Sequence, residues 1–182
     1  MKIVDIEVSA LRVPGWNARS FDGSYDNCIV EVRTDAGITG IAEVDSVPAV
    51  IRAIVEAPSS HVHARGLKDV LVGRDPSDVE ALWELMYDGT SYYGRRGVAI
   101  HAISAIDIAL WDIRGKAAGK PLVELLGGSK RERVKAYGTI YPLGASLDDV
   151  RRNIDRGLRL GLRAIKIVAE PLGAMTSPAP RN

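Results

Sequence analysis

The segment from Ala102 to Gly127 constrains the fold of this chain more than any other part of the 182-residue sequence. In it, and just before it, apolar residues recur at steps of three or four, the spacing of one face of an α-helix. These residues are Ala99, Ile103, Ile106, Leu110, Ile113 and Ala117. The spacing predicts a helix from about Arg96 to Ala118 whose apolar face packs on another part of the protein.

Other residues of the same segment predict where this helix ends and what it exposes. Asp112 and Lys116 lie four residues apart, so their side chains can pair on the outside of the helix. Gly119 and Pro121 follow in the order that ends a helix, because glycine suits the C-cap and proline cannot continue the helix. A well-packed core helix accounts for all of these features.

The first 44 residues predict three antiparallel strands. Apolar and polar residues alternate from Val4 to Ala10, as in a strand with one buried face, and this strand ends near Pro14. A second strand begins with the apolar run at 28–32, and turn residues at 35–37 lead into a third. Residues 15–26, which mix Gly, Asn, Ser and Asp with large rings, predict a loop between the first two strands.

Helices are predicted after the strands. One runs from Pro48 to about Ala57, since proline is tolerated in the first turn of a helix. A second begins where Ser77 and Glu80 can form a capping box, and it ends at Gly89. Three strands followed by helices are typical of an α+β domain.

The pattern changes after residue 128. Residues 134–141 predict a strand, 146–160 a helix and 164–168 another strand. Such a βαβ unit implies parallel strands and a right-handed connection. The last residues contain Pro and small polar side chains without periodicity, which predicts an irregular tail. We therefore predict three parts, with boundaries 1–128, 129–170 and 171–182.

Composition and charge exclude several classes of protein. The net charge is +1 and basic residues alternate with acidic ones, so neither nucleic acid nor a membrane is an expected partner. No apolar run approaches the ~20 residues that cross a bilayer. The N-terminus lacks the pattern of a signal peptide, and the single cysteine, Cys28, cannot form an internal disulfide. A cytoplasmic protein is the simplest interpretation.

The order of residue types in the long helix and just beyond it carries a family resemblance. It runs Ser104-Ala105-Ile106-Asp107, then Ala109-Leu110-Trp111-Asp112-Ile113, Gly115-Lys116, Pro121-Leu122 and Leu125-Leu126-Gly127. This order resembles the signature of the mandelate racemase and muconate lactonizing enzyme branch of the enolase superfamily. The resemblance implies an α+β capping domain, a three-stranded antiparallel sheet followed by helices, plus an incomplete (β/α)8 barrel fragment.

The resemblance implies a catalytic role for Lys166, at the C-terminal end of the second barrel strand. In the family this strand carries Lys-x-Lys. One lysine, whose pKa the other lysine and a nearby metal lower, removes the proton next to a carboxylate, and magnesium stabilises the enediolate. Here Lys166 matches the first lysine and Val168 replaces the second, so the paired base is absent. The alternative is an ordinary strand lysine with its ammonium group in water.

Magnesium is the cofactor that the resemblance implies. In the family its ligands are three carboxylates at the ends of the third, fourth and fifth barrel strands, which are absent from this chain. The scattered acids Glu43, Asp45, Asp107 and Asp112 have no spacing that would supply several oxygen ligands to a hard cation. We therefore assign no metal ligand.

The predicted loop after the first strand corresponds in position to the loop that closes over substrate in the family. The substrate-binding residues that this implies are Trp16, Phe21, Asp22 and Tyr25. Ordinary surface loop residues are the alternative. Farther along, Arg95 and Arg96 could pair with a substrate carboxylate or a neighbouring subunit, because adjacent cations are unfavourable at a helix N-terminus. A solvated helix start is the alternative for this pair.

Two functions remain open. The first is a magnesium-dependent dehydratase or racemase that abstracts the proton alpha to the carboxylate of a hydroxy acid or sugar acid, as a homo-oligomer when complete. The second is a non-catalytic remnant of the capping domain that acts only as a folding or assembly unit. We expect the chain alone to be inactive because the metal-binding strands are missing, and we expect that the reading frame ends early.

Overall fold

The computed structural model describes residues 1–12, 14, 26–140 and 146–167. The chain divides into two compact units, the first containing residues 1–12 and 26–129 and the second containing residues 130–140 and 146–167. The elements of the first unit are β1 (Ile3–Arg12), β2 (Asp26–Thr34), β3 (Thr39–Val44), α1 (Pro48–Glu56), α2 (Leu67–Leu71), α3 (Val79–Gly89), α4 (Val98–Ala118) and α5 (Leu122–Leu125). Those of the second are β4 (Gly138–Ile140), α6 (Leu147–Arg159) and β5 (Ile165–Ile167).

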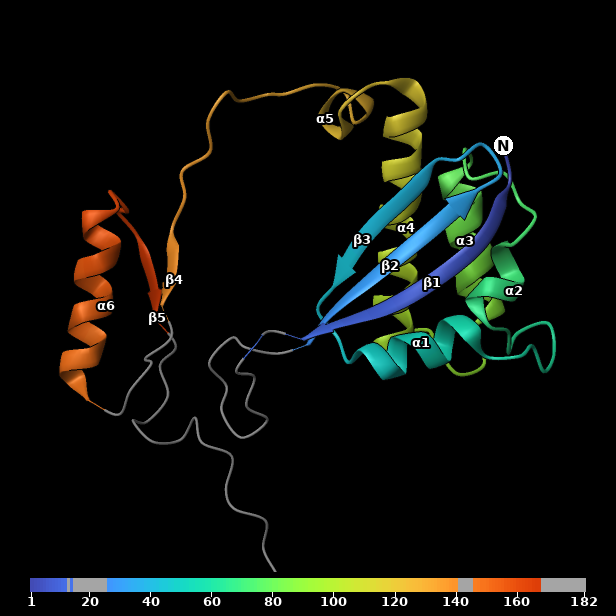
Figure 1. The fold of residues 1–182 in the computed structure, drawn as a ribbon, viewed down its shortest axis with the longest axis horizontal. Coiled ribbons are helices and arrows are strands. Elements are labelled where there is room, and N and C mark those ends of the chain that lie inside the picture. Colours follow the sequence, from blue (N-terminus) through green and yellow to red (C-terminus); the bar gives the residue numbers. More distant parts are fainter. Residues whose placement is uncertain (13, 15–25, 141–145, 168–182) are drawn as a thin grey trace, which may run out of the picture. The chain divides into compact units, whose positions relative to one another are not determined.

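The first unit is a three-stranded sheet with helices packed on one of its faces (Figure 1). Its strands are antiparallel and lie in the order β1-β2-β3, which confirms the predicted fold class. Val30 pairs with Val8 on one side and with Ala42 on the other, and all three side chains are buried. Alternation along the strands therefore directs one row of apolar side chains toward the helices. The prediction for Val4 was wrong: a register shift between Ile3 and Asp5 leaves Val4 exposed and buries Ile3 instead.

Helix α4 supplies much of the core of this unit. Of the predicted apolar face, Ala99, Ile103, Ile106, Leu110 and Ile113 are buried, but Ala117 is exposed. The prediction for Ala117 was wrong because none of the described elements covers the last turn on that side. The helix ends at Gly119 in the left-handed conformation (φ 63°), as predicted.

The buried face of α4 includes more residues than the predicted apolar positions. Three small residues are also buried, namely Ala102, Ala105 and Ala109. They allow the backbone of β3 to come close: a Cβ atom built on Gly40 would lie 2.0 Å from the carbonyl oxygen of Ala109. Only glycine at position 40 permits this approach.

Polar groups complete the contact between α4 and β3. The backbone N–H of Ile41 donates to the Asp112 carboxylate at 2.9 Å, and Lys116 Nζ donates to the Thr39 carbonyl at 2.7 Å. Lys116 Nζ also donates to Asp112 at 2.6 Å, which confirms the predicted pair. Because β3 is an edge strand, these two side chains satisfy backbone groups that lack a neighbouring strand.

The structure corrects one helix start and adds two short helices. The capping box between Ser77 and Glu80 was wrong: Asp78 caps α3, and its carboxylate accepts a hydrogen bond from Ala81 N at 3.2 Å. Ser77 N instead donates to the Asp75 carboxylate in the preceding turn. Helices α2 and α5 were not predicted, because elements this short show no period in the sequence.

The second unit is a strand, a helix and a strand. Gly138 pairs with Ile165 and Ile140 with Ile167, so β4 and β5 are parallel, as predicted. Ser146 caps α6 and accepts a hydrogen bond from Asp149 N at 3.2 Å. β4 is shorter than the predicted strand at 134–141, because no described strand lies beside residues 134–137. No helix among the described residues has the length and apolar composition that a membrane span requires.

The close contact at Gly40 gives a direct test of this packing. We expect Gly40→Ala to lower the free energy of unfolding by about 3 kcal/mol, because the methyl group meets helix backbone that cannot move aside. Gly37→Ala is the matched control: its φ is +74° and nothing lies within 4 Å of the added carbon, so only the cost of a left-handed alanine of about 1 kcal/mol applies. Urea unfolding followed by circular dichroism measures both, and equal losses would contradict the proposed contact.

Candidate functional site

Lys166 lies in the middle of β5, where it pairs with Thr139 of β4. Its side chain is exposed. Since successive side chains of a strand point to opposite faces, Lys166 projects from the face opposite to Ile165 and Ile167. It can therefore present an ammonium group near the carboxyl end of a parallel pair of strands. The catalytic role of Lys166 stays a prediction.

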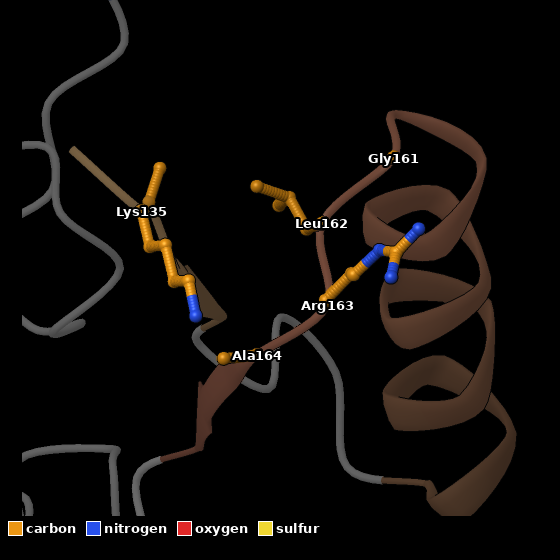
Figure 2. Close-up of a pocket in the computed structure, with 6 residues that line it drawn as sticks. Lys135, Gly161, Leu162, Arg163 and Ala164 are labelled. Carbon is orange, nitrogen blue, oxygen red and sulfur yellow. The ribbon is translucent and has the colours of Figure 1, made fainter. Parts of the chain in front are cut away.

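A cavity of about 650 Å³ in the second unit lies at the other end of these strands. Its lining residues are Lys135, Ala136, Gly161, Leu162, Arg163 and Ala164. All of them precede β4 or β5, so the cavity is at the amino ends of the strands, the end that barrels use for stability and not for catalysis. Figure 2 shows that the cationic ends of Lys135 and Arg163 do not converge. The position of this cavity is therefore not the one at which barrels place catalytic residues.

The four predicted substrate-binding residues, Trp16, Phe21, Asp22 and Tyr25, lie outside the described residues, so their role stays a prediction. The structure does describe both ends of the segment that contains them. Arg12 and Asp26 are the last pair of the β1–β2 ladder, and their side chains form two hydrogen bonds, Nε to Oδ1 at 2.7 Å and Nη2 to Oδ2 at 2.9 Å. This ion pair joins the two ends of the segment at one point.

Sequence reasoning missed the pairing of Arg12 with Asp26. The signal is present, because opposite charges stand at either end of the predicted loop, but only the strand register places them opposite each other. The guanidinium group of Arg12 holds the pKa of the Asp26 carboxyl below its usual value, first through the hydrogen bonds and also through its charge. Asp26 is therefore ionised at neutral pH.

The described residues do not fit a magnesium ion. Within residues 1–12, 14, 26–140 and 146–167, no three or more His, Cys, Asp and Glu side chains gather where they could hold a metal. Asp112 is occupied by Ile41 N and by Lys116. We therefore derive no chemical step through a metal in this chain.

A second cavity, of about 470 Å³, lies between α3 and α4. It is lined by Val79, Glu80, Ala81, Trp83, Glu84, Asp107 and Trp111. Asp107 is half-buried, burial raises its pKa, and it has no hydrogen-bond or ion-pair partner among the described residues. Trp83 stacks on Tyr87 with ring centroids 5.2 Å apart, and the guanidinium of Arg114 lies 4.9 Å from the Trp111 ring centroid. The cavity combines indole rings with carboxylates, a composition that suits a cationic group.

Comparison with known proteins identifies the family to which this chain is similar. Residues 5–127 match the model of the mandelate racemase / muconate lactonizing enzyme, N-terminal domain. The chain is 38% identical over 160 residues to the D-galactonate dehydratase family member RspA of Halomonas elongata, an alignment that covers 82% of this chain and 38% of that protein. It is 45% identical over 103 residues to an arabinonate dehydratase of Saccharolobus solfataricus, which covers 56% of this chain and 27% of the relative.

Comparison of the fold with solved structures points to the same kind of protein as the sequence relatives. A racemase from Streptomyces coelicolor A3(2) with bound magnesium superimposes with a TM-score of 0.77 and 30% identity, covering 93% of this chain and 47% of the racemase. The chain therefore spans less than half the length of each of these three proteins.

The Arg12–Asp26 pair gives a prediction about acid titration. Arg12 lowers the pKa of Asp26 in the folded protein. The pair therefore stabilises the fold at pH values above the pKa that this carboxyl has in the unfolded chain. This stabilisation is lost as the pH falls through the pKa of Asp26 in the folded protein. We expect Arg12→Gln to move the titration midpoint of the Asp26 carboxyl carbon upward in NMR spectra. Arg33→Gln is the control, since Arg33 pairs with Glu7 and Glu31 and should leave Asp26 unchanged. An unaltered midpoint in Arg12→Gln would refute the ion pair.

Proposed function

The chain belongs to the mandelate racemase and muconate lactonizing enzyme family, and we propose that it is the capping part of an enzyme that abstracts the proton alpha to the carboxylate of a sugar acid. The match of residues 5–127 carries this proposal. The relatives named for galactonate and arabinonate support a sugar acid as the substrate class. In such an enzyme the cap closes over substrate while a barrel carries the chemistry.

We assign the residues of this chain to two tasks. Trp16, Phe21, Asp22 and Tyr25 contact the substrate from the segment that the Arg12–Asp26 pair closes. Lys166, the middle residue of β5, contributes a positive charge that suits a substrate carboxylate, and the family match also offers it for proton abstraction. Position 168 is a valine and not a second lysine, so binding the carboxylate is the role that this chain alone supports best.

We further propose that the chain on its own does not complete the reaction. The observation that favours this is the lack of a metal-holding group in the described part of the chain. An enediolate intermediate carries a charge that needs electrostatic stabilisation, and a lone lysine supplies little of it. The chain by itself is then a folding or assembly unit that carries the cap and the first two barrel strands.

Turnover by the isolated chain tests this division. We expect the purified 182-residue protein, given magnesium chloride and galactonate, arabinonate or mannonate, to form no 2-keto-3-deoxy acid and to exchange no alpha proton in D2O by proton NMR. Lys166→Ala is the control for contamination. Turnover that is present in the native sequence and abolished by Lys166→Ala would show that the chain is an enzyme without any further strands, and would refute this part of the proposal.

Substrate contact is tested separately from turnover. The chain contains three tryptophans, so nitrogen-15 NMR resolves the indole N–H groups of Trp16, Trp83 and Trp111. We expect an aldonate to shift the Trp16 signal with a Kd of roughly 1 mM or weaker, because only that ring lies in the assigned substrate segment. Trp83 and Trp111 serve as internal controls, and Trp16→Phe assigns the signal. The assignment of the segment fails if all three signals stay in place or if the neutral aldose shifts Trp16 equally.

A further inference from the structure

The cavity between α3 and α4 has well-supported walls and a size that suits a small molecule. Its volume of about 470 Å³ falls within the usual range of ligand pockets, roughly 300–1,000 Å³. Trp83 of α3 and Trp111 of α4 line it, and both rings also pack against the buried core of the unit. Trp83 is held further by stacking on Tyr87, with ring centroids 5.2 Å apart. The core therefore fixes both indole rings at this cavity.

Asp107 is the group in this cavity that most needs a partner. It is half-buried, so it has lost part of its water, and this burial raises its pKa. It has no hydrogen bond or ion pair among the described residues. Arg114 lies over the Trp111 ring and forms no ion pair in the described part of the chain, so it does not neutralise Asp107. A carboxylate that has lost water without gaining a partner costs free energy, and such groups are typical of binding sites.

Glu80 and Glu84 add two more negative charges to the same cavity. They lie four residues apart on α3, an arrangement in which like charges repel each other. Neither has an ion-pair partner among the described residues. Together with Asp107 they give the cavity three carboxylates, and its described lining contains no Lys or Arg. The electrostatic potential in the cavity therefore favours a positively charged molecule.

The placement of these carboxylates favours an organic cation over a metal ion. In the described part of the chain, no three His, Cys, Asp or Glu side chains lie close enough together to hold a metal. A hard metal ion needs several oxygen ligands around one point, whereas an extended organic cation can meet each carboxylate separately. Indole rings attract cations, and Arg114 shows this at Trp111, where its guanidinium lies 4.9 Å from the ring centroid. A guanidinium group suits Asp107 because it can bond both carboxylate oxygens while its flat face lies on a ring.

We propose that the α3–α4 cavity is a binding site for a small organic dication, in which a short alkyl chain joins a guanidinium group to an ammonium group. The guanidinium pairs with Asp107 on α4, beside the indole rings, and the ammonium lies between Glu80 and Glu84 on α3. Packed helices lie about 8–10 Å apart, so a chain of a few carbons can bridge them. The site takes a cation, whereas the reaction proposed above uses an anionic acid, so the two proposals are independent.

Agmatine, which is 4-aminobutylguanidine, is the probe that matches this description. We expect it to shift the indole N–H signals of Trp83 and Trp111 in nitrogen-15 NMR spectra of the 182-residue chain, with a Kd of roughly 1 mM or tighter. 4-Aminobutylurea keeps the shape and the ammonium group but has no charge at its other end, so we expect it to bind about tenfold more weakly. The proposal is overturned if agmatine shifts neither ring, or if the two compounds bind equally well.

Variants of single carboxylates locate the binding. Asp107→Asn keeps the shape of the side chain and removes its charge, so we expect about tenfold weaker binding of agmatine. Glu84→Gln, at an exposed position where the fold does not depend on the charge, should weaken binding about threefold. Glu56→Gln is the matched control, because Glu56 is an exposed carboxylate on α1 that is not part of the described lining of the cavity.

The comparison of these variants separates a site from general charge attraction. Circular dichroism verifies that each variant retains the fold, and we expect Glu56→Gln to bind agmatine as tightly as the native chain does. Equal weakening by Glu56→Gln and Glu84→Gln would mean that the probe responds only to net charge, and this result would refute the site. Native affinity in a folded Asp107→Asn would refute it as well.

Discussion

The close contact between helix α4 and the edge strand β3 is the interaction on which the first unit depends. Glycine at position 40 lets the strand backbone reach the helix backbone at Ala109, and the small residues on that side of α4 leave the space for it. Asp112 and Lys116 then bond the free backbone groups of the strand. One helix thereby covers the sheet and also closes its edge, which would otherwise be open to other chains.

The same helix explains why so many residue types of the family signature lie in one segment. Its large apolar side chains fill the core, its alanines allow the approach of β3, and its acid–base pair satisfies the edge. Asp107 and Trp111 line a cavity with α3, and Trp111 also packs against the core.

The two units differ in what holds them together. The first buries a continuous apolar core between the sheet and its helices, whereas α6 in the second buries only one residue, Gly157, and leaves Leu147 and Leu158 exposed. Two parallel strands and one helix bury too little apolar surface to close a barrel. The first unit therefore folds around its own core, which suits the capping role that we propose for it.

Local patterns in the sequence determined the elements that local physics controls. Alternation identified the first strand, an apolar run and a turn identified the next two, spacing and the Gly119 cap identified α4, and residue order identified the family. Spacing also predicted the pair of Asp112 with Lys116, whereas the tertiary structure decided the other polar partners named here. Asp112 reaches a strand 71 residues away, Arg12 meets Asp26 because the ladder register places them opposite each other, and Asp78 displaces Ser77 as the cap of α3. Each of these partners depends on where particular backbone atoms lie in space. Some of those atoms belong to residues far away in the sequence, and one belongs to the neighbouring residue. The spacing of side chains in the sequence does not show these positions.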